Sequence, residues 1–174
     1  MSYQVVQVHV PPSPDLRRKL TTVRKVVDID SVNRAGISTM EQLVDYALSL
    51  GIVRKSHPYG AVINRPDANP FDSVLRNRLV LCPVEIETAR KGSDNTKISE
   101  KARNVTSEWP KNEETSLIVD SCIARGTTYA GCFAPIIQER GNSTIVYFVL
   151  IATKPGLRRI DEISKGWVKR VHVV

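Results

Sequence analysis

The residues that could do chemistry gather in one short segment, LIVDSCIARGTTYAG, at positions 117–131. Asp120 stands at the end of an apolar run, and a loop that contains Gly126 follows at once. Thr127 and Thr128 then open an amphipathic stretch typical of a helix. Free N–H groups at the start of a helix, together with hydroxyls, can converge on a phosphate, and a carboxylate can accept hydrogen bonds from ribose hydroxyls. The pattern therefore predicts a loop that binds ribose 5-phosphate.

All candidate site residues lie in this loop. We predict a catalytic role for Asp120 and no protein-bound metal. The predicted phosphate and ribose contacts are Asp120, Ser121, Ala124, Arg125, Gly126, Thr127 and Thr128. A purely structural interpretation stays open, in which Asp120 and Thr127 only cap the helix and Gly126 only makes the turn from strand to helix.

The elements that must position this loop alternate between strand and helix. Strands are predicted at residues 3–10, 61–63, 79–86, 116–119, 144–152 and 168–174, and helices at 15–27, 38–50, 70–78, 127–140 and 157–163. Residues 87–114 are polar and weakly patterned, with a helical turn only at 98–105, which indicates a mobile excursion. The alternation predicts one α/β domain over residues 1–174, with a mostly parallel sheet flanked by helices.

The amino-acid composition limits the kinds of ligand and partner that this protein is expected to bind. The net charge of +7 favours an anionic ligand, but the basic residues are dispersed, which suits a phosphorylated small molecule better than nucleic acid. No apolar run is long enough to span a membrane, and no basic-then-apolar signal stands at the start. The three cysteines have no metal-binding spacing, and His9, His57 and His172 are scattered. We expect a cytoplasmic protein.

The loop carries a family resemblance. VDSCIARGTTYAG resembles the phosphoribosyl pyrophosphate loop of uracil phosphoribosyltransferases, which runs V-D-P-M-L-A-T-G-G-T-A, with Asp120, Ala124, Gly126 and Thr128 matching in place. ERGNSTIVYFVLIATKPGLRRIDE is similar to the family's helix end, buried strand and A-x-P-G-x-x-R segment. SEWPKNEETSLIVD and VHVPPSPDLRRKLTTVRKV also resemble family segments, in the right order.

The resemblance implies a type I phosphoribosyltransferase fold, Mg²⁺ with phosphoribosyl pyrophosphate, a pyrimidine-type acceptor such as uracil, and a homo-oligomer. It also implies that Arg158 and Arg159 line the ligand cleft. The sequence departs from the family in its loop, where Arg125 replaces a threonine and Thr127 replaces the second glycine. No R-A-G pyrophosphate loop follows residues 79–86, and no glycine-rich uracil-binding segment follows the last strand.

Three functions are compatible with these features. The first is a phosphoribosyltransferase that binds ribose 5-phosphate and transfers it to a pyrimidine-type base. The second is a catalytically degenerate member that binds a nucleotide or phosphate as a regulator or assembly subunit. The third is an RNA-binding module that uses the basic surface.

Overall fold

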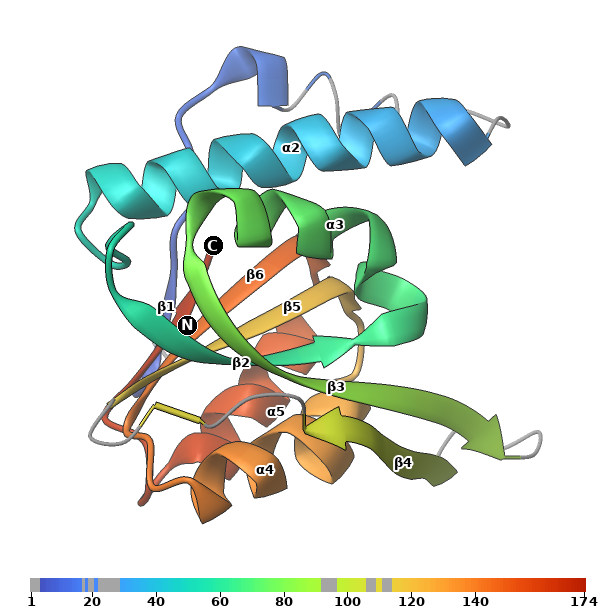
Figure 1. Ribbon diagram of the computed structural model, residues 1–174, viewed down its shortest axis with the longest axis vertical. Helices are drawn as coiled ribbons and strands as arrows, with labels where there is room; N and C mark the ends of the chain where they lie inside the picture. Colours follow the sequence, from blue (N-terminus) through green and yellow to red (C-terminus); the bar gives the residue numbers. More distant parts are fainter. Residues whose placement is uncertain are drawn as a thin grey trace.

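The structure, a computed structural model, describes residues 4–16, 18, 21, 29–91, 97–105, 109–110 and 114–174. Within this part of the chain, the strands form one sheet in the order β1-β7-β6-β5-β2-β3-β4 (Figure 1). The strands are β1 Val6–Val8, β2 Pro58–Asn64, β3 Val80–Lys91, β4 Lys97–Val105, β5 Thr115–Ile123, β6 Thr144–Ala152 and β7 Arg170–Val173. Only the β3–β4 pair is antiparallel, which confirms the predicted mostly parallel α/β sheet.

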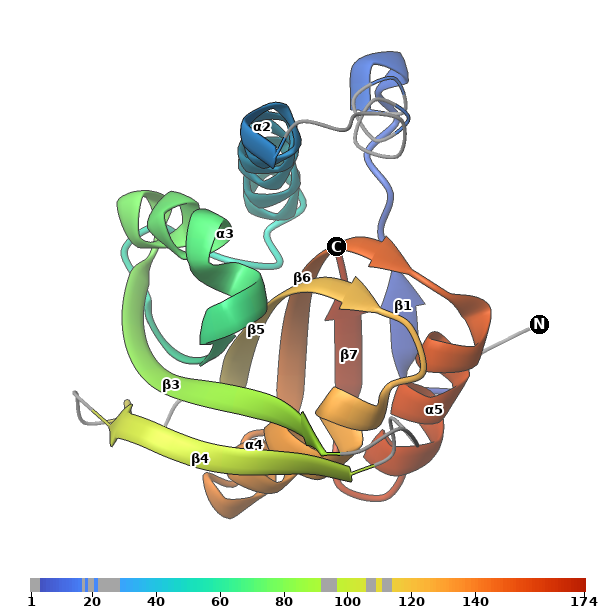
Figure 2. The same cartoon turned by 90° about the vertical axis from the view of Figure 1, so that its right-hand side faces the viewer.

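Helices cover both faces of the sheet (Figure 2). One face carries α2 (Ile29–Ser49) and α3 (Arg65–Arg78), and the other carries η1 (Tyr129–Phe133), α4 (Ala134–Glu139) and α5 (Lys154–Ser164). Each face has its own apolar core. β5 and β6 contribute to both cores, as expected of strands buried on two sides. No described helix has the length and apolarity needed to cross a bilayer.

The chain reverses its direction across the sheet between β2 and β5. β2 leads through α3 to β3 on one side, whereas β5 leads through α4 to β6 on the other. Because β2 and β5 pair in parallel, their carboxyl ends lie at the same edge of the sheet. In open α/β sheets, ligands bind outside the carboxyl ends of the strands at such a switch point. The fold therefore directs attention to the segments that follow Asn64 and Ile123.

Two predicted helix starts were wrong: the helix predicted at 70–78 begins at Arg65, and the one before it starts still further from its predicted position. The helix predicted to begin at residue 38 begins at Ile29, and Thr39 lies inside it, where its hydroxyl donates to the Ala35 carbonyl at 2.8 Å. Tertiary packing extends this helix, since Gly36 lets it approach α3 closely. A Cβ at Gly36 would lie 2.8 Å from the Phe71 ring.

The helical turn predicted at residues 98–105 was also wrong. This segment is β4, which pairs antiparallel with β3, for example Glu87 with Lys101. β3 itself continues to Lys91, and residues 87–91 of the polar stretch pair with residues 97–101 of β4. Of the helix predicted at 15–27, residues 15, 16, 18 and 21 are helical, and the others lie outside the described residues.

Candidate functional site

The strand predicted to end at residue 119 continues further, so the loop that follows it is shorter than predicted. β5 runs on to Ile123, so Asp120 and Ser121 are strand residues and the loop proper is 124–126. Gly126 has φ of 68°, a left-handed conformation that favours glycine. Helical backbone begins at Thr127, and the first N–H groups of a helix have no partner within it. Of the predicted contacts, Ala124, Arg125 and Thr127 are exposed, Thr128 is half-buried, and Gly126 is buried.

The helix that follows opens with a widened turn. Across Tyr129–Phe133 the hydrogen bonds span five residues, and the Ala134 N–H donates to the Tyr129 carbonyl. Pro135 comes next and has no N–H, so the regular ladder is interrupted here. Tyr129 and Phe133 both point into the core beneath the loop, where they contact the ring of Tyr147.

The first turn of α5 supports the loop from the side. The Thr153 N–H donates to the Ile123 carbonyl at 2.9 Å, and its hydroxyl donates to the Ala124 carbonyl. Gly156 makes this contact fit, because a Cβ there would lie 2.6 Å from the Ile123 side chain. A Cβ at Gly126 would in turn lie 3.1 Å from the Gly156 carbonyl oxygen. Two glycines, one in each segment, thus allow the loop and α5 to pack together.

This junction is electropositive. The exposed cations of the two packed segments are Arg125, Lys154, Arg158 and Arg159. The nearby acid is Glu162, whose carboxylate lies 3.7 Å from the Arg159 guanidinium. Cations around unsatisfied N–H groups at a helix start favour an anionic ligand.

Asp120 lies below the loop and is turned inward. Its side chain is 3% exposed. The Ser121 N–H donates to Oδ1 at 2.8 Å, and the Tyr147 hydroxyl donates to Oδ2 at 3.0 Å. Burial, followed by the charge of Asp120, raises the pKa of Tyr147 well above its usual value. The phenol therefore stays protonated and remains a hydrogen-bond donor.

The end of β2 and the start of α3, which face the loop across the switch point, are not among the predicted site residues. The strand beside β5 is β2, not β3, and α3 begins directly after it at Arg65. Asn64 is fully buried and precedes the helix, with Pro66 in its first turn. The signal was present as a short apolar strand followed by Asn-Arg-Pro. The Arg34-Ala35-Gly36 triplet, by contrast, lies within α2.

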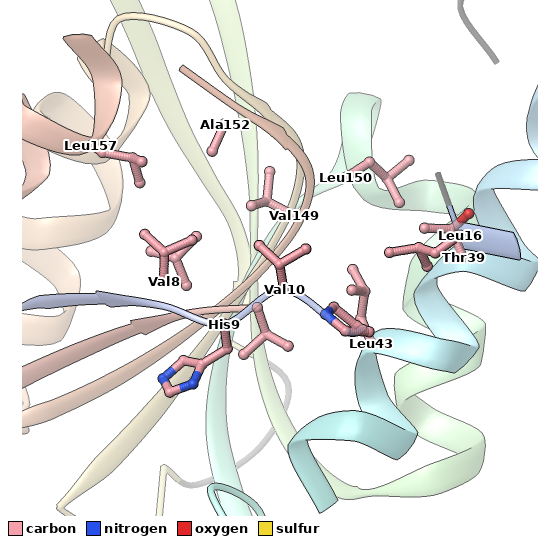
Figure 3. A pocket seen from close by; sticks show the side chains of 13 residues that line it. Val8, His9, Val10, Leu16, Thr39, Leu43, Val149, Leu150, Ala152 and Leu157 are labelled. Atoms are coloured by element: carbon pink, nitrogen blue, oxygen red, sulfur yellow. The ribbon is translucent and has the colours of Figure 1, made fainter. Parts of the chain in front are cut away.

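An apolar cavity of about 200 Å³ opens at the same edge of the sheet (Figure 3). The residues that line it include Val8, Val10, Leu16, Thr39, Leu43, Val149, Leu150, Ala152 and Leu157. Figure 3 shows the side chains from β1, β6 and α5 facing those from α2 across the cavity, while the His9 ring points away. Ala152 and Leu157 line this cavity and flank Thr153 and Gly156, which pack against the loop at 124–126.

The described residues contain no group of three or more His, Cys, Asp or Glu side chains that could hold a metal. Among the described residues, Cys82, Cys122 and Cys132 form no disulfide. The candidate site consists of backbone N–H groups at a helix start and exposed cations, with the buried Asp120 carboxylate beneath them.

A sheet of this strand order, with six parallel strands and helices on both faces, is the architecture of a type I phosphoribosyltransferase fold. Solved structures with this fold superpose on nearly the whole chain. Adenine phosphoribosyl transferase from Trypanosoma brucei, in complex with AMP, pyrophosphate and ribose-5-phosphate, matches with a TM-score of 0.64 and 11% identity over 97% of this chain and 81% of its own. Orotate phosphoribosyltransferase from Aeropyrum pernix matches with a TM-score of 0.50 and 18% identity over 91% and 76%.

The AQ2163 protein from Aquifex aeolicus gives a TM-score of 0.69 at 16% identity, over 96% of this chain and 86% of its own. At these identities the likeness defines the fold. No family model matches the sequence, and no curated protein matches it.

Proposed function

We propose that this protein binds the 5-phosphate and ribose of a phosphoribosyl ligand on the loop after β5 and transfers the phosphoribosyl group to a ring nitrogen of a base. The observation that supports this most is the left-handed Gly126 loop at the β2–β5 switch point, surrounded by exposed cations. The phosphate would accept hydrogen bonds from the N–H groups and hydroxyls of Thr127 and Thr128. Arg125 and Ala124 would complete its contacts, beside Ser121 and Gly126.

The pyrophosphate of the donor would lie across the switch point, toward the start of α3. Two helices, α3 and the one that opens at Thr127, begin at the adjacent carboxyl ends of β2 and β5. Each helix start contributes a partial positive charge. A donor with a phosphate at one end and a pyrophosphate at the other suits this pair of helix starts better than a single phosphate does. Asp120, at the base of the loop, is proposed to accept hydrogen bonds from the ribose hydroxyls and so to act as the catalytic carboxylate.

The chemistry is a displacement at C1′ of the ribose. The lone pair of the acceptor nitrogen forms the new bond to C1′, the bond from C1′ to the pyrophosphate oxygen breaks, and pyrophosphate leaves with that electron pair. The nitrogen's proton passes to solvent. Mg²⁺ would arrive on the pyrophosphate as part of the substrate and neutralise charge on the leaving group. The protein's share of catalysis is to position the reactants and to stabilise charge.

A pyrimidine-type acceptor would occupy the apolar cavity beside the loop. An apolar cavity of about 150 Å³ accommodates a benzene ring, so the volume here is sufficient for one flat ring. Val10 is 61% exposed at the cavity, so a charge there should reduce affinity for the base without unfolding the chain. Val10→Asp should raise the KM for the base, while Val80→Asp, at a similarly exposed valine outside the cavity, should not.

The test of the proposed function is release of pyrophosphate. The protein is mixed with phosphoribosyl pyrophosphate, Mg²⁺ and a panel of bases that includes uracil, and pyrophosphate is measured. We expect release that depends on both base and Mg²⁺ and that Asp120→Asn abolishes while the melting temperature is maintained. Absence of release across the panel would reject the transferase.

One observation favours a binder without turnover as the second candidate. Both oxygens of Asp120 already have donors within the protein, as an internal structural carboxylate would. Such a protein would bind ribose 5-phosphate or a nucleotide and release no pyrophosphate. At a ligand concentration 100 times the Kd, binding would stabilise the fold by about 2.7 kcal/mol, which a thermal shift would detect. The homo-oligomer implied by the resemblance is proposed for either candidate, and light scattering would test it.

A further inference from the structure

Thr153, which directly precedes α5, holds two successive carbonyl groups at the end of β5 and in the loop that follows. Its N–H donates to the Ile123 carbonyl at 2.9 Å, and its hydroxyl donates to the Ala124 carbonyl. The same hydroxyl accepts a hydrogen bond from the Gly156 N–H at 3.2 Å, so its direction is fixed from two sides. Gly156 lies against both carbonyls, since a Cβ there would be 2.8 Å from the Ala124 oxygen and 3.0 Å from the Ile123 oxygen. Both oxygens therefore face the start of α5.

The direction of these two carbonyls determines the direction of the next two N–H groups. No peptide bond of the described chain is cis, and in a planar trans peptide the C=O and the N–H point in opposite directions. The N–H groups of Ala124 and Arg125 therefore point away from Thr153. Because β6, which ends beside Thr153, and β2 flank β5 on opposite sides, these N–H groups point toward β2 and the switch point. Both residues are exposed, so a ligand can reach them.

We infer that Thr153 is a positioning residue, which turns the N–H groups of Ala124 and Arg125 toward the phosphate of the bound ligand. This inference rests on the proposed function and adds a residue from outside the loop. Successive N–H groups that point to one side form a concave site for an anion, and Gly126, with φ of 68°, follows them and turns the chain into the helix. Without the Thr153 hydroxyl, the peptide between Ala124 and Arg125 is free to rotate, and phosphate binding should weaken.

Three variants separate this role from a loss of stability. Thr153→Val removes the hydroxyl and keeps the shape of the side chain and the N–H, whereas Thr153→Ser keeps the hydroxyl. Ser13→Ala is the matched control, because Ser13 Oγ accepts the Leu16 N–H at 3.3 Å, a hydrogen bond of the same capping type that involves no residue of the loop. Calorimetric titration would measure the Kd of inorganic phosphate. We expect Thr153→Val to weaken binding about tenfold, and Thr153→Ser and Ser13→Ala to change it less than about twofold.

Amide proton shifts in NMR spectra test the direction of the two N–H groups themselves. Added inorganic phosphate should move the Ala124 and Arg125 amide protons of the wild type downfield, because each becomes a donor to an anion. In Thr153→Val, both shifts should be smaller at saturating phosphate.

Three results would overturn the inference. The first is equal weakening of phosphate binding by Thr153→Val and by the Ser13 control, which would show a role in stability alone. The second is unchanged affinity in Thr153→Val. The third is a phosphate-induced shift at Thr127 and Thr128 without one at Ala124 and Arg125. If the wild type binds neither inorganic phosphate nor ribose 5-phosphate, the proposed function fails instead, and this result is distinct from the other three.

Discussion

Gly126 determines whether the loop can keep its shape. It has φ of 68°, which costs another residue about 1–2 kcal/mol. Gly126→Ala would also place a Cβ 3.1 Å from the Gly156 carbonyl oxygen and from Arg159. We expect the variant to shift the loop away from α5 and to weaken inorganic phosphate binding at least about tenfold, as measured by calorimetric titration.

Gly141 is the control at the same scale. Its φ is 72°, and a Cβ there would meet nothing within 4 Å. Gly141→Ala should therefore carry the same backbone strain and lower the free energy of unfolding by about 1–2 kcal/mol, with phosphate affinity unchanged. If both variants weaken phosphate binding equally, the loss reflects stability and not the loop.

Candidate site residues could be predicted where they follow one another in the chain. Contacts between residues that only strand register brings together could not. The segment from Asp120 to Thr128 is contiguous, so a turn at Gly126 followed by a helix could be predicted from residue types alone. His9 and His172 lie 163 positions apart, yet their ring nitrogens are 2.9 Å apart. That contact depends on β1 pairing with β7 in one particular register, Gln7 beside His172. No local pattern encodes this register.

At the scale of elements, close packing at the amino end of β2 gives a stability prediction. Trp109 packs directly on Gly60, where a Cβ would lie 2.0 Å from the indole. The indole is held in place, because its Nε1–H donates to Asn142 Oδ1 at 3.1 Å and the Arg140 guanidinium lies 5.6 Å from the ring centroid. Gly60→Ala should therefore displace the tryptophan and lower the free energy of unfolding by about 2–3 kcal/mol, measured by urea denaturation.

The contrasting variant is Gly131→Ala. Gly131 lies in the widened helical turn, and a Cβ there would meet nothing within 4 Å. Alanine should raise the free energy of unfolding by about 0.5–1 kcal/mol, because glycine loses more backbone entropy in a helix. A similar loss of stability in both variants would contradict the packing argument.

Elements with strong apolar patterns could be predicted, whereas their ends and neighbours could not. β6 was predicted with its observed bounds, since its nine residues are almost all apolar. α2 and β4 were misassigned because Gly36 and the β3–β4 pairing act through contacts distant in sequence. The segment after β2 at the switch point was missed for the same reason. β2, and not β3, lies beside β5. This strand order depends on pairing between segments distant in the sequence, which no local pattern encodes.

For the molecule as a whole, the edge strand β1 is held by two acid-sensitive contacts. At the start of β1, Asp161 Oδ1 accepts hydrogen bonds from the N–H groups of Gln4, Val5 and Val6 at 2.9, 2.8 and 3.1 Å. Burial raises the pKa of Asp161, but these three donors, together with Lys165, lower it by more, so the net pKa is below its usual value. Directly after β1, the His9 ring forms a hydrogen bond with the His172 ring. Burial, then His9 and Arg170, lower the pKa of His172 to about 4.

These two contacts predict how stability depends on pH. The unfolded chain protonates His172 near pH 6.5, whereas the folded chain does so only near pH 4, so stability is lost as the pH falls from about 6.5 to about 4. Because the ring is half-exposed, we expect a loss of about 1 kcal/mol, or about 2–4 °C in melting temperature.

The contribution of Asp161 is lost at lower pH, since its folded pKa lies below 3.8. His172→Asn should reduce the first loss to the contribution of His9, whose pKa is also lowered by burial and by Arg170, and keep the second. Acid should thus release β1 first, and amide exchange at His9, whose N–H donates to the Val173 carbonyl, should accelerate before global unfolding. Melting curves that stay flat between pH 6.5 and 4 in the wild type would contradict this account, because the His pair is the part of the β1 attachment that titrates in that window.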